Sequence, residues 1–168
     1  MKCPKCGEQL VEARATVDTP YRYVTSGLKN IYLVGIVLRR CKRCNSENAV
    51  VPRMADLHRA IARVLLDKPE RLNGDELRFL RKHAGLSALD FAAQLQIEPE
   101  TLSRFENDKQ DLGVTTEKLA RAIVKAEIQS AEKAGLRDFL LRKQRLRTAT
   151  AGQPSLFSFC RSHWKKAA

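Results

Sequence analysis

The sequence of 168 residues lacks any long apolar run. No segment approaches the ~20 consecutive apolar residues that a membrane-spanning helix requires, so we expect no membrane association. Residues 1–6 also lack the apolar stretch of a signal peptide, which favours a cytoplasmic protein. The hydrophobic content of 43% nevertheless supports a packed core, so we expect a globular chain with one medium domain or two small ones.

Arrangements of catalytic residues are missing as well. The chain has no Ser/His/Asp or Cys/His set at a meaningful spacing, no phosphate-binding glycine loop and no paired carboxylates in an apolar context. His58 and His83 are each isolated among basic residues, and we expect both to be ordinary surface residues rather than ligands. The sequence therefore favours a binding protein over an enzyme.

Acidic residues are scarce, but only in two parts of the chain. The formal net charge is +12, from 31 Lys and Arg against 19 Asp and Glu. Residues 1–50 carry nine basic against four acidic residues, residues 51–136 fourteen against fourteen, and residues 137–168 eight against one. Because non-specific affinity for DNA arises mainly from phosphate neutralisation by Lys and Arg, any such affinity must come largely from the two basic flanks.

Disulfides are not expected in a reducing cytoplasm, so the five cysteines are considered first as metal ligands. Two CxxC motifs, Cys3-Pro-Lys-Cys6 and Cys41-Lys-Arg-Cys44, are separated by thirty-four residues. Together they can complete the Cys₄ shell that structural Zn²⁺ prefers, and we predict one zinc ion per chain. A redox motif and unrelated cysteines are weaker alternatives, and Cys160 is expected to be a bystander. The basic residues within the motifs would offset the thiolate charge: Lys5, Lys42 and Arg43.

Residues 1–50 are predicted to form a small β-rich domain around this metal. Loose alternation in residues 10–17 and 21–24 and a β-rich apolar run in residues 28–38 indicate about three strands. So small a sheet cannot bury enough surface alone, so metal binding would supply much of its folding free energy. Its tyrosines either form a contact surface for a partner or pack on the sheet: Tyr21, Tyr23 and Tyr32.

Helical periodicity dominates the rest of the chain. Residues 51–71 are predicted to form a connecting helix, and residues 72–134 an all-α domain. Residues 135–168 form a basic C-terminal extension, with an amphipathic helix over 137–147 and a polar linker over 148–155. This extension could dock on the body of the protein, contact phosphates or be disordered.

Signals at helix ends support this division. Asn73 with Glu76 is a capping box, and it starts the first helix of the all-α domain. A long helix at the end of that domain runs to about Ala134. Apolar residues along it are spaced for packing and for dimerisation: Leu119, Ile123, Ala126 and Ile128.

Two short helices joined by a tight turn are predicted between the helix that starts at Asn73 and the long helix that runs to about Ala134. Ser87 caps the first, and the second runs from about Pro99 to Glu106. Helices joined by so short a turn cross steeply, so the second presents one face that suits a DNA major groove. The predicted DNA contacts are Ser87, Glu100, Thr101, Ser103, Arg104 and Lys109.

Two of these residues are expected to read bases. The Arg104 guanidinium can pair with guanine O6 and N7. Glu100 lies one turn earlier and could accept a hydrogen bond from a cytosine amine, or it could form only an i, i+4 ion pair with Arg104.

The motif Ser-x-x-x-Phe-Ala-x-x-Leu-x-Ile-x-x-x-x-Leu-Ser-Arg-Phe-Glu-Asn, ending at Asn107, resembles the helix-turn-helix of Cro/repressor-type (XRE-like) regulators. The resemblance covers roughly residues 72–126 and implies binding of double-stranded DNA. Gln96 stands where that family usually has a glycine in a left-handed conformation, which other residues adopt at some cost. Ala88 replaces a polar residue that often contacts a phosphate.

The order of the parts is similar to that of the MqsA/YgiT-type zinc-finger antitoxins. Cys-Pro-x-Cys-Gly is followed by a β-rich insert with Tyr-x-x-Ser-Gly-Leu-x-Asn, by Arg-Arg-Cys-x-x-Cys and by the helix-turn-helix motif, over about residues 1–126. This resemblance implies a zinc-bearing N-terminal domain that holds a small toxin protein and a helical domain that dimerises on operator DNA. Glu100 falls where the best-known member has an asparagine that reads a base.

The sequence thus predicts an α+β fold, in which a Cys₄ zinc domain precedes a helix-turn-helix bundle of four to five helices and a basic extension. It predicts a homodimeric, DNA-binding transcriptional regulator, the antitoxin of a type II toxin–antitoxin operon that autorepresses its own promoter. The alternatives are a zinc-ribbon protein-interaction module, a stand-alone transcription factor without a toxin, and an RNA-binding protein that uses the basic extension.

Overall fold

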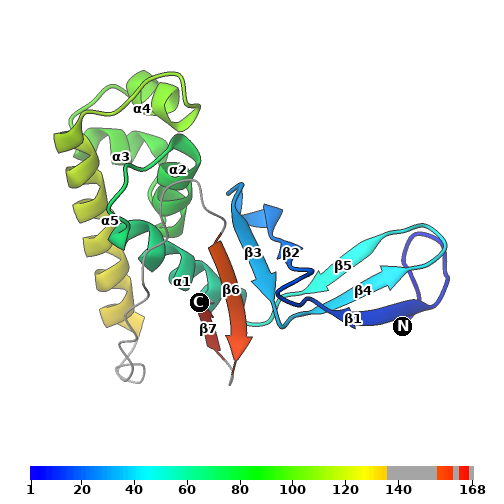
Figure 1. The fold of residues 1–168 in the computed structure, drawn as a ribbon. Helices are drawn as coiled ribbons and strands as arrows, with labels where there is room; N and C mark the ends of the chain where they lie inside the picture. The colour runs from blue at the N-terminus through cyan, green and yellow to red at the C-terminus, as the bar shows by residue number, and fades with distance from the viewer. Residues whose placement is uncertain (136–154, 161–162, 167–168) are drawn as a thin grey trace. The chain divides into compact units, whose positions relative to one another are not determined.

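A computed structural model of the chain describes residues 1–135, 155–160 and 163–166 (Figure 1), which contain five α-helices and seven strands. The chain divides into two compact units. The first comprises Met1–Thr25, Lys29–Ala60 and Gly152–Ala168, and the second comprises Ser26–Leu28 and Ile61–Ala151. The helix and linker predicted over 137–147 and 148–155 fall almost entirely outside the described residues.

A three-stranded antiparallel sheet lies next to the cysteines in the first unit. It contains β1 (Leu10–Arg14), β4 (Val37–Cys41) and β5 (Glu47–Val50), in the order β1-β4-β5. The central strand β4 is the most buried of the three, with Leu38 3% and Cys41 1% exposed. Pairing on both sides therefore fixes the end of β4, where Cys41 is located.

A second sheet completes the first unit. It contains β2 (Tyr21–Arg22), β3 (Ile31–Val34), β6 (Ser155–Cys160) and β7 (His163–Lys166), in the order β2-β3-β6-β7. A short 3₁₀ helix, Val24–Ser26, follows β2. Strand β6 runs parallel to β3, while the other two pairs are antiparallel. Part of the predicted C-terminal extension thus joins the sheet of the N-terminal region.

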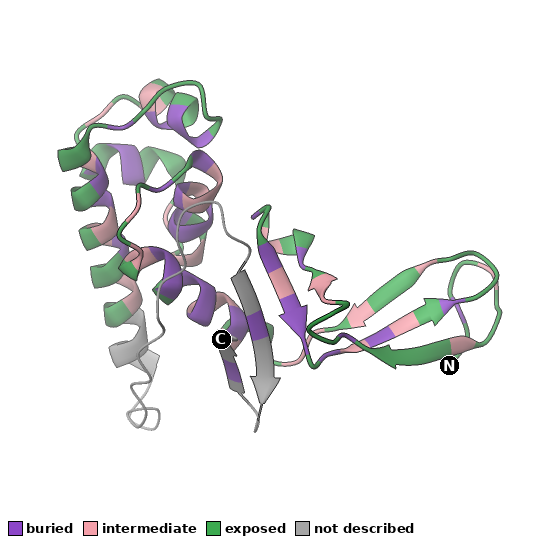
Figure 2. Ribbon diagram, in the orientation of Figure 1, coloured by how far each residue is buried: buried purple, intermediate pink, exposed green. Residues whose placement is uncertain are grey.

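The predicted single sheet of about three strands is therefore two sheets, and Gly35 separates them. The apolar run 28–38 breaks at Gly35, whose φ of +77° is in the left-handed region that favours glycine. Its N–H donates to the carbonyl of Ala15 at 2.8 Å, and the N–H of Ala15 donates to Ile36 at 3.0 Å. The chain thus leaves β3, which is largely buried (Figure 2), and enters β4 of the other sheet.

The helices are α1 (Met54–Asp67), α2 (Gly74–His83), α3 (Ala88–Gln94), α4 (Pro99–Glu106) and α5 (Val114–Gly135). The two units divide within α1, after Ala60. Apolar side chains at helical spacing form the core of the second unit, and its most buried members are Ile61, Leu77, Leu80, Phe91, Ala92, Leu102, Ala120 and Val124, each 0% exposed.

Helix starts follow the predicted caps. The Asn73 side chain accepts from the N–H of Glu76 at 2.9 Å, and the N–H of Asn73 donates to the Glu76 carboxylate at 2.8 Å, which confirms the capping box. The Ser87 hydroxyl accepts from the N–H of Asp90 at 3.0 Å and donates to its carboxylate at 2.6 Å. Short-range signals therefore determine where α2 and α3 begin.

Two buried carboxylates connect segments of the second unit that are far apart in sequence. Glu106 is 6% exposed and accepts from Arg81 at 2.7 and 3.0 Å. Glu117 is also 6% exposed and accepts from the N–H of Leu72 at 2.9 Å and from Arg121 at 2.9 Å. Burial alone would raise the pKa of Glu117, but the N–H of Leu72 and the guanidinium groups of Arg121 and Arg71 hold that pKa below its usual value.

His58 is not the exposed surface residue that the sequence suggested. It lies half-buried on α1, and its Nε2 is 2.9 Å from the hydroxyl of Tyr23, which is only 1% exposed. Burial lowers the pKa of His58 and raises that of Tyr23, because both charged forms lose hydration. Tyr23 therefore packs in the core of the first unit. For this tyrosine, packing rather than a contact surface for a partner is the alternative that holds.

Candidate functional sites

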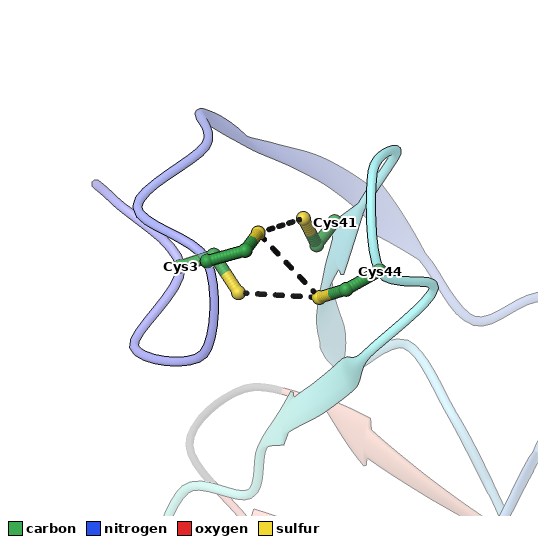
Figure 3. Close-up of side chains that lie close together, drawn as sticks. Cys3, Cys41 and Cys44 are labelled. Carbon is green, nitrogen blue, oxygen red and sulfur yellow. Dashed lines mark hydrogen bonds between the residues drawn. The ribbon is translucent and has the colours of Figure 1, made fainter.

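The four cysteines of the two CxxC motifs converge at one end of the β1-β4-β5 sheet. Cys3 and Cys6 come from the N-terminal turn, while Cys41 ends β4 and Cys44 lies in the turn that follows. Their sulfur atoms all lie within 4.8 Å of one another, with separations of 3.4 Å between Cys6 and Cys41 and 3.6 Å from Cys44 to both Cys3 and Cys6. In Figure 3 the side chains of Cys3, Cys41 and Cys44 point toward a shared centre, and a dashed line joins the sulfur atoms of Cys3 and Cys44.

Both cysteine turns have the same backbone design. The N–H of Cys3 donates to Glu8 at 2.7 Å, and the N–H of Cys41 donates to Ser46 at 2.9 Å, five residues ahead in each case. A residue in the left-handed region follows the second cysteine of each pair, Gly7 at φ +74° and Asn45 at φ +52°. Asparagine tolerates this region better than most residues, so Asn45 is the counterpart of Gly7 that sequence reasoning missed.

The cluster fits a four-coordinate metal ion. Four sulfur atoms at ~2.3 Å from a tetrahedral centre would be ~3.8 Å apart, close to the separations observed here. The four predicted ligands are therefore brought together, and the donor set suits a soft or borderline divalent ion. Cys3 and Cys41 are buried while Cys44 is exposed, so the site borders on solvent.

Ser46 is a polar neighbour of the cluster that the sequence analysis did not identify. Its hydroxyl oxygen lies 3.4 Å from the sulfur of Cys3 and 3.2 Å from that of Cys44. This contact is the main cause that lowers the pKa of Cys3 to about 6, and it also lowers the pKa of Cys44. The position of Ser46, two residues after the second CxxC motif, is the sequence signal that could have indicated this contact.

The thiol of Cys6 behaves in the opposite way. The N–H of Glu8 favours its thiolate, but its contact with Cys41, its burial and its contacts with the other thiols raise the pKa of Cys6 to about 12. Four negative charges this close repel one another, so a bound cation is needed before all four thiols ionise together. The basic residues expected to offset this charge are exposed in the two turns: Lys5, Lys42 and Arg43.

The second candidate site is the exposed face of α4. Helix α3 ends at Gln94 and α4 begins at Pro99, so residues 95–98 form the turn. Gln96 has φ +55°, as expected for a residue in the position of a left-handed glycine. Leu102 and Phe105 are 0% and 5% exposed, so α4 packs on the core with one side and leaves the other free.

The predicted DNA contacts are only partly brought together. Glu100, Ser103 and Arg104 are exposed and, with Pro99, line a shallow depression of about 430 Å³. Thr101 is half-buried at the side of this face, and Lys109 is exposed in the loop after α4. Ser87 is exposed as well, but its hydroxyl is engaged with Asp90. Within the described part of the chain, Glu100 and Arg104 form no ion pair.

Asn107 holds the end of α4 and was not predicted to do so. Its amide donates to the carbonyl of Ser103 at 2.7 Å, and its side-chain oxygen accepts from Arg78 at 2.9 Å. The start of α2 approaches the same place so closely that a Cβ on Gly74 would collide with the carbonyl oxygen of Phe105. These contacts fix α4 against α2 and so orient its exposed face.

An apolar stripe on α5 has no cover within the described part of the second unit. Leu119 is 41% exposed, Ala126 is exposed and Ile123 is half-buried, whereas Val124 on the other side of the helix is fully buried. These residues lie at positions that share one face of a helix. Three of the four predicted dimerisation residues therefore share this stripe, whereas Ile128 is half-buried on the side of Val124, four residues after it.

The described helices include none that is long and apolar enough to cross a bilayer. We compared the chain with models of known protein families and with curated proteins, and neither comparison gave a match.

Proposed function

We propose that the chain is a zinc-stabilised, DNA-binding transcriptional regulator, and that it acts as the antitoxin of a type II toxin–antitoxin operon whose promoter it represses. The observation that carries the DNA-binding part is the exposed face of α4. This helix is fixed on its inner side by Leu102 and on its end by Asn107, and it presents Arg104 without an ion-pair partner among the described residues. A rigid helix with a free guanidinium suits direct readout of a guanine.

Zinc is the proposed metal of the Cys₄ cluster. The support is the all-thiolate donor set and the paired turns, which are typical of structural zinc sites in intracellular proteins. The four cysteines would hold the ion, and the ion would supply folding free energy and remove the repulsion among the thiolates.

A homodimer is proposed because one short helix rarely binds DNA tightly alone. The exposed stripe of Leu119, Ile123 and Ala126 on α5 supports this, since pairing two copies would bury it. The operator would then be pseudo-palindromic, with two half-sites related by the symmetry of the dimer.

The DNA-binding proposal is tested with a competition gel-shift on the chain's own promoter fragment, at a salt concentration that suppresses non-specific binding. We expect Arg104→Ala to lose ~1–3 kcal/mol of operator binding, and with it the preference for operator over competitor DNA. Lys125→Ala is the matched control, because Lys125 is exposed on α5 and lies outside the predicted contacts. Retained operator preference in a folded Arg104→Ala variant would refute the assignment of α4.

The antitoxin part is tested through the neighbouring reading frame. We expect a small protein encoded beside this chain to copurify with it, and we expect Cys41→Ser to abolish this association while leaving the helices folded. A partner that binds equally well to the Cys41→Ser variant would contradict a role for the zinc-bearing unit in toxin binding.

A second candidate, a protein-interaction module that does not bind DNA, is favoured by the ion pairs of the second unit. Four of its arginines are engaged by the buried carboxylates of Glu106 and Glu117: Arg71, Arg78, Arg81 and Arg121. These four arginines are therefore not free to neutralise phosphates. Absence of any retarded promoter complex at low salt would favour this candidate.

A further inference from the structure

The C-terminal β6–β7 hairpin completes a sheet that would otherwise be open along β3. On one side of β3, Tyr21 and Arg22 of β2 pair with it, and the N–H of Tyr23 donates to the carbonyl of Ile31 at 2.9 Å. On the other side, β6 pairs with all four residues of β3, from Ile31 opposite Ser155 to Val34 opposite Ser158. The hairpin thus supplies the pairing along the whole of this second side of β3.

Two side chains of the hairpin anchor it to the first unit. Phe157, the register partner of Leu33, is 0% exposed, as is Leu33 itself. Trp164 is 6% exposed, and its indole N–H donates to the carbonyl of Pro52 at 2.8 Å. The surface beside β3 therefore accepts one parallel strand, an aromatic side chain next to Leu33 and one N–H donor at Pro52.

The hairpin reaches this surface from the far end of the chain. Val34 and its partner Ser158 are 124 positions apart, so the pairing is held by non-covalent contacts between distant segments. Without β6, this side of β3 would present unpaired N–H and C=O groups. Such an edge pairs readily with an extended segment of another protein.

We propose that the open side of β3 is a strand-accepting surface for an extended, aromatic segment of a partner protein, and that the β6–β7 hairpin occupies it in competition with that partner. The inference rests on the protein-binding part of the proposed function. The hairpin is the template for the ligand: the partner strand runs parallel to β3 and brings an aromatic residue to the place of Phe157. A tethered competitor acts at an effective concentration on the order of millimolar, so the full chain binds such a partner weakly until its own hairpin is released.

The test uses full-length protein and a fluorescent peptide with the sequence of residues 153–166 as the probe. Trp164→Ala removes the anchor at Pro52, and Trp164→Phe is the milder variant that keeps an aromatic ring and loses the N–H. We expect the peptide to bind Trp164→Ala at least tenfold more tightly than the wild-type chain, with Trp164→Phe between them. Hydrogen exchange of peptides covering residues 29–36 should be faster in the variants and slow again when the probe is added.

Three outcomes would overturn the proposal. The first is equal peptide affinity for all three proteins. The second is loss of metal and of exchange protection throughout the first unit in both variants, which would make the hairpin an inseparable part of the core. The third is cross-linking of β3 to β6 between differently labelled copies, which would make the occupant a second copy. These readouts involve neither DNA nor a toxin, so they fail or succeed independently of the operator and copurification experiments.

Discussion

Gln96 occupies a backbone conformation that its side chain disfavours. Its φ of +55° is in the left-handed region, which costs residues other than glycine about 1–2 kcal/mol, whereas glycine in an ordered segment costs about 0.5–1 kcal/mol in chain entropy. Since Gln96 is exposed in the turn between α3 and α4, its side chain contributes little packing.

We therefore predict that Gln96→Gly stabilises the protein by up to about 1 kcal/mol, measured by urea denaturation of the helical signal. Gln94→Gly is the matched control, since Gln94 is an exposed residue at the end of α3 with helical geometry. Glycine there should destabilise by about 0.5–1 kcal/mol. The same sign of change at both positions would contradict this account of the turn.

Substitutions of Cys41 and Cys160 distinguish a metal ligand from a cysteine outside the predicted site. Cys41 is 1% exposed and belongs to the cluster, whereas Cys160 lies outside the two CxxC motifs. We predict that Cys41→Ser lowers the metal content of purified protein from about one ion per chain to nearly none, because a three-thiolate site binds zinc more weakly. Cys160→Ser should retain the ion, and elemental analysis of both variants decides the matter. Full metal content in Cys41→Ser would refute the assignment of the ligands.

At the scale of elements, Glu117 joins the start of α5 to the segment before α2. Its folded-state pKa is held below the unfolded value, so it contributes stability that is present above the unfolded pKa of ~4.3 and is lost as pH falls through the folded pKa. At neutral pH, Glu117→Gln leaves the Arg71 and Arg121 guanidinium groups without their carboxylate.

We predict that Glu117→Gln costs about 1–3 kcal/mol at pH 7, and that the difference from the wild type shrinks below pH 4. Asp111→Asn is the control, because Asp111 is exposed in the loop before α5. Unfolding free energies measured from pH 3 to pH 7 test this prediction. A difference that stays constant over that range would show that Glu117 acts through packing rather than through its charge.

The helices were predictable because their signals are local. The caps at Asn73 and Ser87 and the apolar periodicity of α2 to α4 are encoded within a few residues of each helix. The Cys₄ cluster was predictable for a similar reason, since each CxxC motif is local and four thiols need one shared centre.

Contacts between distant segments were not predictable in this way. The parallel pairing of β3 with β6 depends on a register that neither strand specifies alone, and Glu117 gives no sign in the sequence that it will meet Leu72. The apolar run 28–38 also read as one strand, because only the left-handed φ of Gly35 assigns its halves to different sheets.

At the scale of the whole molecule, the two units are expected to respond differently to loss of metal. The first depends on small sheets and the cysteine cluster, while the second has an apolar core and buried ion pairs of its own. We predict that a chelator increases hydrogen exchange in β1, β4 and β5 of the full-length protein and leaves α2 to α4 protected. Readdition of zinc should restore protection, whereas simultaneous loss of protection in α2 to α4 would show that the units fold as one.

The first unit also contains residues from both ends of the chain, and this has a consequence for its synthesis. The ribosome adds about 5–20 residues per second, so Ser158 follows its partner Val34 after roughly 6–25 s. For most of that interval both cysteine motifs and β3 have been synthesised, whereas β6, the strand that pairs with β3, has not. A partner present at the ribosome would thus meet this edge of the nascent first unit before its own chain can pair with it.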